Sequence, residues 1–176
     1  MKTIILISCC KQKLERGIAE NFYQSTGFKK SLAYAKNLKP NGIFILSAKH
    51  HLVSLNQQLE YYDECLNDKT ENEKRNWGKT VLSQLAKKTD LENDKFIILA
   101  GKSYYKYLIT GLKNYELPLE GLALGYRLQW LDQHTIKENL LCENLHCFFN
   151  EQKRFSFPFD SKDLPENGIY ILFDNL

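Results

Sequence analysis

The sequence predicts an α/β protein with a mainly parallel central sheet. Three short runs of apolar and β-branched residues carry this prediction, namely Lys2–Ile7, Gly42–Ile45 and Lys95–Ala100. Continuous apolar runs of this length are typical of strands that are covered on both faces, as in parallel sheets. Segments with helical periodicity separate the runs, and this alternation is expected when helices connect parallel strands.

The first helix is expected to begin near Ser25 or Thr26, either of which is a natural N-cap. Apolar residues then recur at spacings of four and three, at Phe28, Leu32 and Ala35. Tyr23 precedes the cap, and we interpret it as the ring of a hydrophobic staple, with a site aromatic as the alternative.

Three more helices are expected further along the chain. Thr70–Glu73 forms a capping box, in which the threonine and glutamate side chains satisfy backbone N–H groups of the first turn. The apolar face of the helix that it opens comprises Trp77, Val81, Leu82 and Leu85. A helix after Gly101 carries Tyr104, Leu108, Ile109 and Leu112, and a last one has an apolar stripe at Leu124, Leu128 and Leu131.

Length and composition favour one globular domain. The chain has 176 residues, 43% of them hydrophobic and 26% charged, which is ordinary for a folded domain and argues against disorder. We expect a single α/β domain at 1–150 and a tail at 151–176. The tail contains an edge strand interrupted by Pro158 and a final strand at Ile169–Phe173, since proline is confined to edges or bulges of sheets.

The cysteines and the apolar runs indicate a cytoplasmic protein. The five cysteines show neither a disulfide framework nor a paired zinc pattern, so we expect reduced thiols. No apolar run reaches the length of a membrane span, and the N-terminal run is too short for a signal peptide.

Charge is unevenly distributed along the chain. The net charge is +3, but residues 1–60 carry nine Lys and Arg against three Asp and Glu. This local excess suggests a phosphate-bearing partner. Surface lysines that serve solubility explain it about as well.

Polar side chains follow the second apolar run. Ser47, Lys49 and His50 come directly after it, at the carboxyl end of a predicted strand, where open α/β sheets bind ligands. A hydroxyl, a fixed cation and an imidazole suit a negatively charged substrate. A solvated turn after the strand is the alternative explanation.

The first apolar run ends in Ser8 and Cys9, with Lys11 and Lys13 close behind. Small residues at a strand tip let backbone N–H groups approach a ligand, whose charge the lysines could meet. We interpret Cys9 as a small buried hydrophobe rather than a nucleophile. No helix-opening glycine pattern follows, so neither a Walker loop nor a dinucleotide loop is predicted.

Tyr62 and Asp63 lie in a predicted loop. Tyr62 could stack on a base, and Asp63 could orient a hydroxyl or a water, or pair with Lys49. A structural tyrosine beside solvated carboxylates is the competing interpretation, with similar weight.

Glycines mark the later candidate sites. Gly101 follows the third apolar run, where glycine permits close backbone approach and the next helix start favours an anion. A glycine that serves only the turn is the commoner case. Arg127 lies off the apolar stripe, behind Gly121 and Gly125, and is placed to reach a phosphate or carboxylate at the helix start.

Four motifs stand in one order along residues 1–135. They are Ile7–Cys9 with the two lysines, Leu46–His50, Ala100–Gly101 with Tyr104, and Leu119–Gly121 leading through Gly125 to Trp130–Leu131. Together they resemble a bacterial domain family of unknown function whose members are often labelled peroxide stress protein, YaaA-like. The matching positions are Ser8, Cys9, Lys11, Lys13, Lys49, His50, Asp63, Gly101, Tyr104, Gly121, Gly125 and Arg127. His51 departs from the pattern, where the family usually has glycine, which puts the shape of the turn after Lys49 in doubt.

The same strand-end arrangement has a fainter likeness to the uracil-DNA-glycosylase-like domain of archaeal tRNA-guanine transglycosylases. That likeness implies a three-layer α/β/α sandwich, Rossmann-like or uracil-DNA-glycosylase-like, that handles nucleic acid or a nucleobase. Separately, Pro165–Asp174 looks like the opening strand of a GIY-YIG nuclease. The sequence ends before that fold's later motifs, so a nuclease is not predicted from it.

Two functions are compatible with these motifs. In the first, the chain hydrolyses an N-glycosidic bond of a nucleotide or nucleic-acid base. Asp63 would then activate water or stabilise an oxocarbenium ion, His50 would act as acid or electrostatic partner, and Lys11, Lys49 and Arg127 would hold phosphate. In the second, it is a non-catalytic DNA-binding module in an oxidative-stress or phage-defence response, as the family label implies. A small-molecule sensor is a third option.

We expect no cofactor. A metal site is also not predicted, because no set of His, Cys, Asp and Glu has ligand spacing. His50, His51 and Asp63 could still meet in space.

Overall fold

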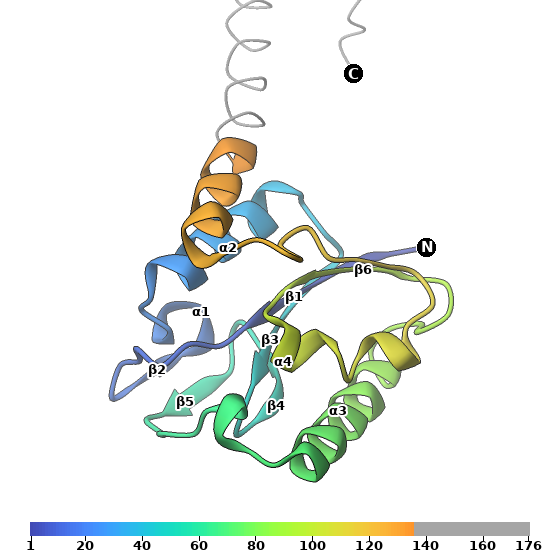
Figure 1. The fold of residues 1–176 in the computed structure, drawn as a ribbon, viewed down its shortest axis with the longest axis horizontal. Helices are drawn as coiled ribbons and strands as arrows, with labels where there is room; N and C mark the ends of the chain where they lie inside the picture. The colour runs from blue at the N-terminus through green and yellow to red at the C-terminus, as the bar shows by residue number, and fades with distance from the viewer. Residues whose placement is uncertain (136–176) are drawn as a thin grey trace, which may run out of the picture. The chain divides into compact units, whose positions relative to one another are not determined.

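The computed structural model describes residues 1–135, which form a mixed α/β unit around a five-stranded sheet (Figure 1). The strand order in this sheet is β4-β3-β1-β6-β7. The domain limit predicted at residue 150 and the tail predicted at 151–176 lie outside the described residues.

Strand β1, Thr3–Ser8, lies at the centre of the sheet. It pairs in parallel with β3, Gly42–Ser47, on one side and with β6, Lys95–Leu99, on the other. The short strand β7, Tyr115–Glu116, continues the parallel order beside β6. The three apolar runs therefore form the central parallel strands, which confirms the predicted α/β class and the mainly parallel sheet.

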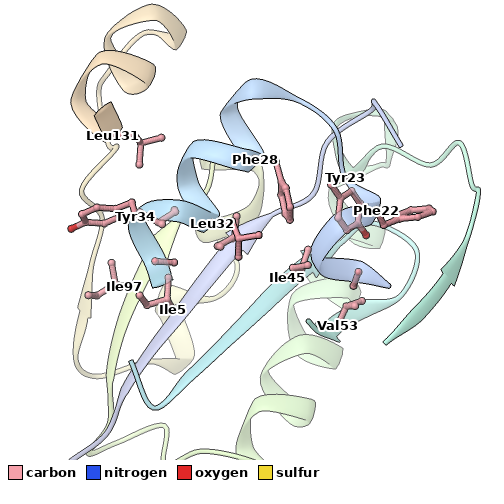
Figure 2. Packing of buried hydrophobic residues seen from close by; sticks show 14 of the residues in the cluster. Ile5, Phe22, Tyr23, Phe28, Leu32, Tyr34, Ile45, Val53, Ile97 and Leu131 are labelled. Carbon is pink, nitrogen blue, oxygen red and sulfur yellow. The ribbon is translucent and has the colours of Figure 1, made fainter. Parts of the chain in front are cut away.

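Helix α2, Thr26–Asn37, packs on one set of sheet side chains (Figure 2). Ser25 is its N-cap, as predicted, and the Ser25 hydroxyl accepts a hydrogen bond from the backbone N–H of Phe28 at 3.2 Å. The buried cluster under this helix includes Ile5, Phe28, Leu32, Ile45, Ile97 and Leu131.

Helix α3, Glu71–Ala86, packs on the other set. Thr70 and Glu73 form the predicted capping box at its start. Successive side chains of a strand point to opposite faces of the sheet, and β1 accordingly gives alternate residues to two clusters. The cluster under α3 includes Ile4, Leu6, Phe96, Trp77, Val81 and Leu85.

Several short elements were not predicted. Strand β4, His51–Ser54, pairs with β3 in an antiparallel way. Strands β2, Arg16–Ile18, and β5, Gln58–Glu60, form a separate two-stranded ribbon. The remaining short pieces are α1, Ala19–Phe22, and the 3₁₀ helix η1, Leu66–Asp68. Segments of three or four residues are too short to show a clear hydrophobic period.

The segment after β6 differs from the prediction. Helix α4 covers only Lys102–Tyr105 and is followed by a 3₁₀ turn, η2, at Ile109–Gly111. Tyr104, Tyr105, Leu108 and Leu112 are buried all the same, so the apolar pattern reflects burial in the core and not one continuous helix. The single helix predicted through residue 112 is therefore wrong.

The last described helix spans residues 124–135. Leu131 is buried, as the predicted stripe requires, but Leu124 is 73% exposed. The first turn of this helix therefore extends beyond the hydrophobic cluster that covers its remainder.

Candidate functional site

The carboxyl ends of β1, β3 and β6 meet at one edge of the sheet. Ser8 is in register with Leu46, and Ile7 is in register with Leu99. In this sheet β1 has β3, the next of its strands along the chain, on one side and the later β6 on the other, so the strand order changes direction at β1. Open α/β sheets bind ligands in the crevice at such a switch point.

A pocket of about 170 Å³ opens at this edge. Four of its lining residues are among the predicted site residues: Ser8, Cys9, Gly101 and Arg127. The pocket also contains residues that sequence reasoning did not assign to a site, including Cys10, Ser25, Gly27, Ser31, Leu124 and Leu128. Ser25 was recognised only as a helix cap, and the cap itself was the signal that could have placed α2 beside the strand ends.

Arg127 is fixed against the end of β6. Its Nε donates a hydrogen bond to the carbonyl oxygen of Leu122 at 2.7 Å. Its Nη1 lies 3.7 Å from the position that a Cβ would occupy on Gly101. The guanidinium therefore lies beside a backbone without a side chain, and within residues 1–135 its remaining N–H groups have no hydrogen-bond partner and can donate to an anion.

The start of α2 forms another wall of the pocket. Ser25 caps the helix, and Gly27 and Ser31 follow within its first two turns. The first N–H groups of a helix lack intrahelical partners and carry partial positive charge. Together with Arg127, this helix start makes the pocket suited to a negatively charged group.

Behind the pocket lies a chain of buried hydroxyl groups, which we call the tyrosine cluster: Tyr23, Ser47 and Tyr62. Ser47 Oγ lies 2.9 Å from the Tyr62 hydroxyl, which lies 2.8 Å from the Tyr23 hydroxyl. Ser47 Oγ also accepts the backbone N–H groups of Lys49 and His50, at 3.3 and 3.0 Å. Since a serine oxygen has two acceptor positions, the Ser47 hydroxyl hydrogen is left to donate to Tyr62.

The tyrosine cluster is structural rather than ligand-facing. Ser47 is fully buried, and Tyr62 is 4% exposed, so the Tyr62 ring has no open face on which a base could stack. Burial raises the pKa of Tyr23 and of Tyr62 above the ordinary tyrosine value, and both hydroxyls stay neutral. We therefore assign Ser47 and Tyr62, both predicted to bind ligand, to positioning the turn and the wall of the site.

Cys9 connects the pocket to this interior. Cys9 is one of the lining residues, and its Sγ lies 3.3 Å from the hydroxyl of Tyr104. Tyr104 itself is 9% exposed. Burial raises the pKa of the Cys9 thiol, although hydrogen bonding with Tyr104 opposes this. A protonated thiol is a poor nucleophile, which agrees with the interpretation of Cys9 as a packed residue.

Lys13, Lys49 and His50 surround the Tyr62 ring. The Nζ atoms of Lys13 and Lys49 lie 4.3 and 5.7 Å from its centroid, and the His50 ring meets it edge to face. Burial, and next the charge of Lys49, lower the pKa of His50. Its Nε2 is buried and has no hydrogen-bond partner within the described part of the chain. A neutral imidazole at physiological pH does not suit the role of general acid.

The Lys49–His50 stretch forms a hairpin turn rather than a loop from a strand to a helix. β3 ends at Ser47 and β4 begins at His51, with these two residues paired. His51 has φ +62°, the left-handed conformation that favours glycine and is frequent at the exit of three-residue hairpin loops. The histidine thus adopts the backbone that a glycine would provide at the same place.

Ten predicted site residues lie outside the pocket lining, and the four of them not yet described are exposed. These four are Asp63, Lys11, Gly121 and Gly125. Asp63 makes no hydrogen bond or ion pair within residues 1–135, so pairing with Lys49, one of the alternatives for Asp63, is not seen there. Gly121 has φ +72°, which explains a glycine at that turn without a ligand.

Two negative findings concern the described residues alone. Among residues 1–135, no three His, Cys, Asp or Glu side chains come together in a way that could hold a metal ion. No helix in the same range has the length and apolar character needed to cross a membrane.

Comparison with known proteins gives one match. The model of a family of unknown function, DUF6884, matches residues 4–133. The chain belongs to the DUF6884 family. The matched range runs from β1 into the 124–135 helix, so it contains every residue that lines the pocket of this DUF6884 protein. No curated protein and no solved structure matches the chain.

Proposed function

We propose that this DUF6884 protein binds a nucleotide, or a phosphate-bearing end of a nucleic acid, at the carboxyl-end pocket. The observation that carries the proposal is the Arg127 guanidinium, which lies beside Gly101 and shares the pocket with the start of α2. Arginine and a helix N-terminus are both common partners of phosphate groups. Among the described residues of the lining, Arg127 is the one charged side chain.

The size of the pocket indicates which part of the ligand it holds. Its volume of about 170 Å³ is below the roughly 300–1,000 Å³ of pockets that enclose a drug-sized ligand. A phosphate fits such a volume, while the sugar and base would lie nearer the mouth. Leu124 lines the pocket and is 73% exposed, so it offers an apolar contact there.

The distribution of lysines supports the same ligand class. Lys13 and Lys49 sit over the Tyr62 ring next to the strand ends, and Lys11 is exposed on the same loop as Lys13. Cations around a cleft raise the local concentration of anionic ligands and speed their association. In this proposal these lysines attract the ligand, and Arg127 binds it.

Binding is better supported than hydrolysis of an N-glycosidic bond. Such hydrolysis needs a carboxylate or another base near the sugar, and none of the described residues of the lining is Asp, Glu or His. Asp63 is exposed, and His50 lies beside Tyr62 outside the lining. We therefore propose a non-catalytic binding module. Release of free base from a nucleotide by the purified protein, abolished by Asp63→Asn, would reverse this choice.

We further propose that the fold is a three-layer α/β/α sandwich of Rossmann-like or uracil-DNA-glycosylase-like type, in a YaaA-like relative. Support comes from α2 and α3, which pack on two separate hydrophobic clusters that contain alternate residues of β1. It also comes from Ser8, Cys9, Gly101 and Arg127, four positions of the YaaA-like pattern that line one pocket. The cytoplasmic location and the GIY-YIG likeness stay predictions from the sequence.

Thermal stability in the presence of ligands tests the binding proposal. A ligand that binds only the folded state raises stability by about 2.7 kcal/mol at a concentration of 100 times its Kd. Nucleoside monophosphates should therefore raise the melting temperature, whereas the matching nucleosides should not. Equal shifts from nucleotide and nucleoside would show that the phosphate is not the recognised group.

The residue assignment is tested by Arg127→Gln, measured by calorimetric titration with a nucleoside monophosphate. A hydrogen bond to a charged group contributes roughly 1.5–3 kcal/mol, so affinity should fall by about 10- to 100-fold. Arg16→Gln is the matched control, because Arg16 is exposed on β2 and does not line the pocket. An unchanged affinity in Arg127→Gln would overturn the assignment.

A further inference from the structure

A second hollow lies on α3, away from the carboxyl-end pocket. Glu71, Arg75, Lys79 and Leu82 of α3 line it together with Lys106, Tyr107 and Thr110 from the segment after α4. Helix α3 and the segment after α4 lie side by side (Figure 1). The volume of the hollow is about 380 Å³. We call it the α3 groove.

Close packing between α3 and its neighbour builds this groove. A Cβ added to Gly78 would lie 2.6 Å from the Cβ of Tyr107, a distance that real side chains do not tolerate. A Cβ added to Gly111 would lie 2.7 Å from a methyl carbon of Leu82. Glycine at both positions lets the segment after α4 lie directly against the helix, so the groove has defined walls.

The single carboxylate of the described groove lining is already engaged. Glu71 accepts hydrogen bonds from Lys106 Nζ at 2.8 Å and from the Tyr107 hydroxyl at 2.7 Å. These hydrogen bonds lower the pKa of Glu71, which keeps it ionised and bound to Lys106 at neutral pH. The ion pair ties the two walls together and leaves little negative charge for any other partner.

Arg75 and Lys79 are the other two cations of the described lining, and the charge of Arg75 contributes to the lowered pKa of Glu71. They stand four residues apart on α3 and are both exposed, so they lie on the same face of the helix. Within residues 1–135 neither forms a hydrogen bond or an ion pair. With Lys106 and Glu71 included, the groove lining carries a net charge of about +2, and this excess comes from Arg75 and Lys79.

We propose that the α3 groove binds the phosphodiester backbone of a single-stranded nucleic acid, through Arg75 and Lys79. Two adjacent cations on an open groove suit a repeating anion, and a defined cleft with aromatic and hydroxyl groups suits a flexible strand. The proposal extends the proposed function, since it adds a backbone contact outside the carboxyl-end pocket. It does not require that Arg127 bind the same strand.

The test is fluorescence anisotropy of a labelled single-stranded DNA oligonucleotide at several salt concentrations. For single strands the slope of log affinity against log salt falls by roughly 0.7 for each phosphate neutralised. The double variant Arg75→Gln/Lys79→Gln should therefore weaken binding and reduce the slope by about 1.4.

The control must remove two charges elsewhere. Lys87→Gln/Lys113→Gln does so at exposed positions outside the groove and should leave the slope nearly unchanged. An equal loss of affinity in both double variants would overturn the proposal for the α3 groove, because the overall charge of the protein would then explain binding. An unchanged slope in Arg75→Gln/Lys79→Gln would overturn it as well, as would capture of an acidic peptide in place of DNA.

The two proposals fail in different ways. Nucleoside monophosphates that bind wild type and Arg75→Gln/Lys79→Gln alike, but not Arg127→Gln, support the carboxyl-end pocket whatever the DNA result. A protein that binds monophosphates but no oligonucleotide refutes the α3 groove alone.

Discussion

Tyr62→Phe tests whether the tyrosine cluster holds the hairpin turn in place. The change removes one hydroxyl oxygen, and with it the contacts of 2.9 Å to Ser47 and 2.8 Å to Tyr23. Each buried hydrogen bond contributes about 1 kcal/mol, and a donor left without an acceptor costs about 1–3 kcal/mol. The Ser47 hydroxyl would be such a donor, so the free energy of unfolding should fall by about 2–3 kcal/mol.

Urea unfolding followed by tryptophan fluorescence measures this change. Trp77 is a suitable reporter, because its Nε1 donates to the carbonyl oxygen of Ser47 at 2.8 Å. Tyr61→Phe is the matched control: Tyr61 is the neighbouring tyrosine, is 47% exposed and should change stability by less than about 0.5 kcal/mol. A loss below about 0.5 kcal/mol in Tyr62→Phe would refute the reasoning.

A double-mutant cycle separates the direct contact from indirect effects. Ser47→Ala removes the donor to Tyr62 together with the acceptor of two backbone N–H groups. Residues in one hydrogen-bond network have coupling energies of about 0.5–3 kcal/mol. Ser47→Ala/Tyr62→Phe should therefore cost less than the sum of the two single variants. Strict additivity would mean that the two hydroxyls do not interact.

Three other predictions concern backbone strain, close packing and pH. His51→Gly should raise stability by about 0.5–1 kcal/mol in thermal unfolding, because it relieves the left-handed penalty at φ +62°; His51→Ala, which keeps that penalty, should bring no gain. Gly78→Ala should destabilise α3 by about 1–3 kcal/mol through its contact with the neighbouring segment, whereas Gly27→Ala, whose Cβ would meet a methyl carbon at 3.7 Å, should not. Burial raises the pKa of the Cys9 thiol in the folded state. The stability that this thiol contributes is therefore fully present below the thiol pKa of the unfolded chain, and it is lost as pH rises through the thiol pKa of the folded protein. Alkylation at pH 8 should accordingly be slower at Cys9 in the folded protein than in urea, and equal rates would contradict its burial.

Strong local signals in the sequence were sufficient to predict the central strands of the sheet and the starts of two helices. β1, β3 and β6 are uninterrupted apolar runs, and Ser25 and Thr70 are residues whose side chains bond to the backbone of the turn that follows them. These signals act between neighbours in the chain, and tertiary packing only reinforces them. The short strand β4 depends instead on pairing with β3. A pattern within its four residues does not predict that pairing.

Only part of the candidate site was predicted from the sequence. Its residues are brought together by the topology of the sheet, which local sequence patterns do not specify. Gly101 and Arg127 were both identified, and the structure places them side by side. Lys49 and His50 follow the carboxyl end of β3, as expected, but they lie in a hairpin turn to β4 and pack beside Tyr62 outside the pocket lining. A strand-to-helix loop and a hairpin turn have the same polar composition, so the residues alone did not distinguish them.

The charge states of the groups in and beside the pocket indicate which class of ligand it can hold. Burial raises the pKa of Cys9, Tyr62 and Tyr104, so these groups are neutral at physiological pH and present hydrogen-bonding atoms without charge. Burial lowers the pKa of His50, which makes it neutral too. The Arg127 guanidinium is the one charged group among the described residues of the lining. Neutral groups beside the pocket and a cation in its lining suit the retention of an anion, which is the function that we propose.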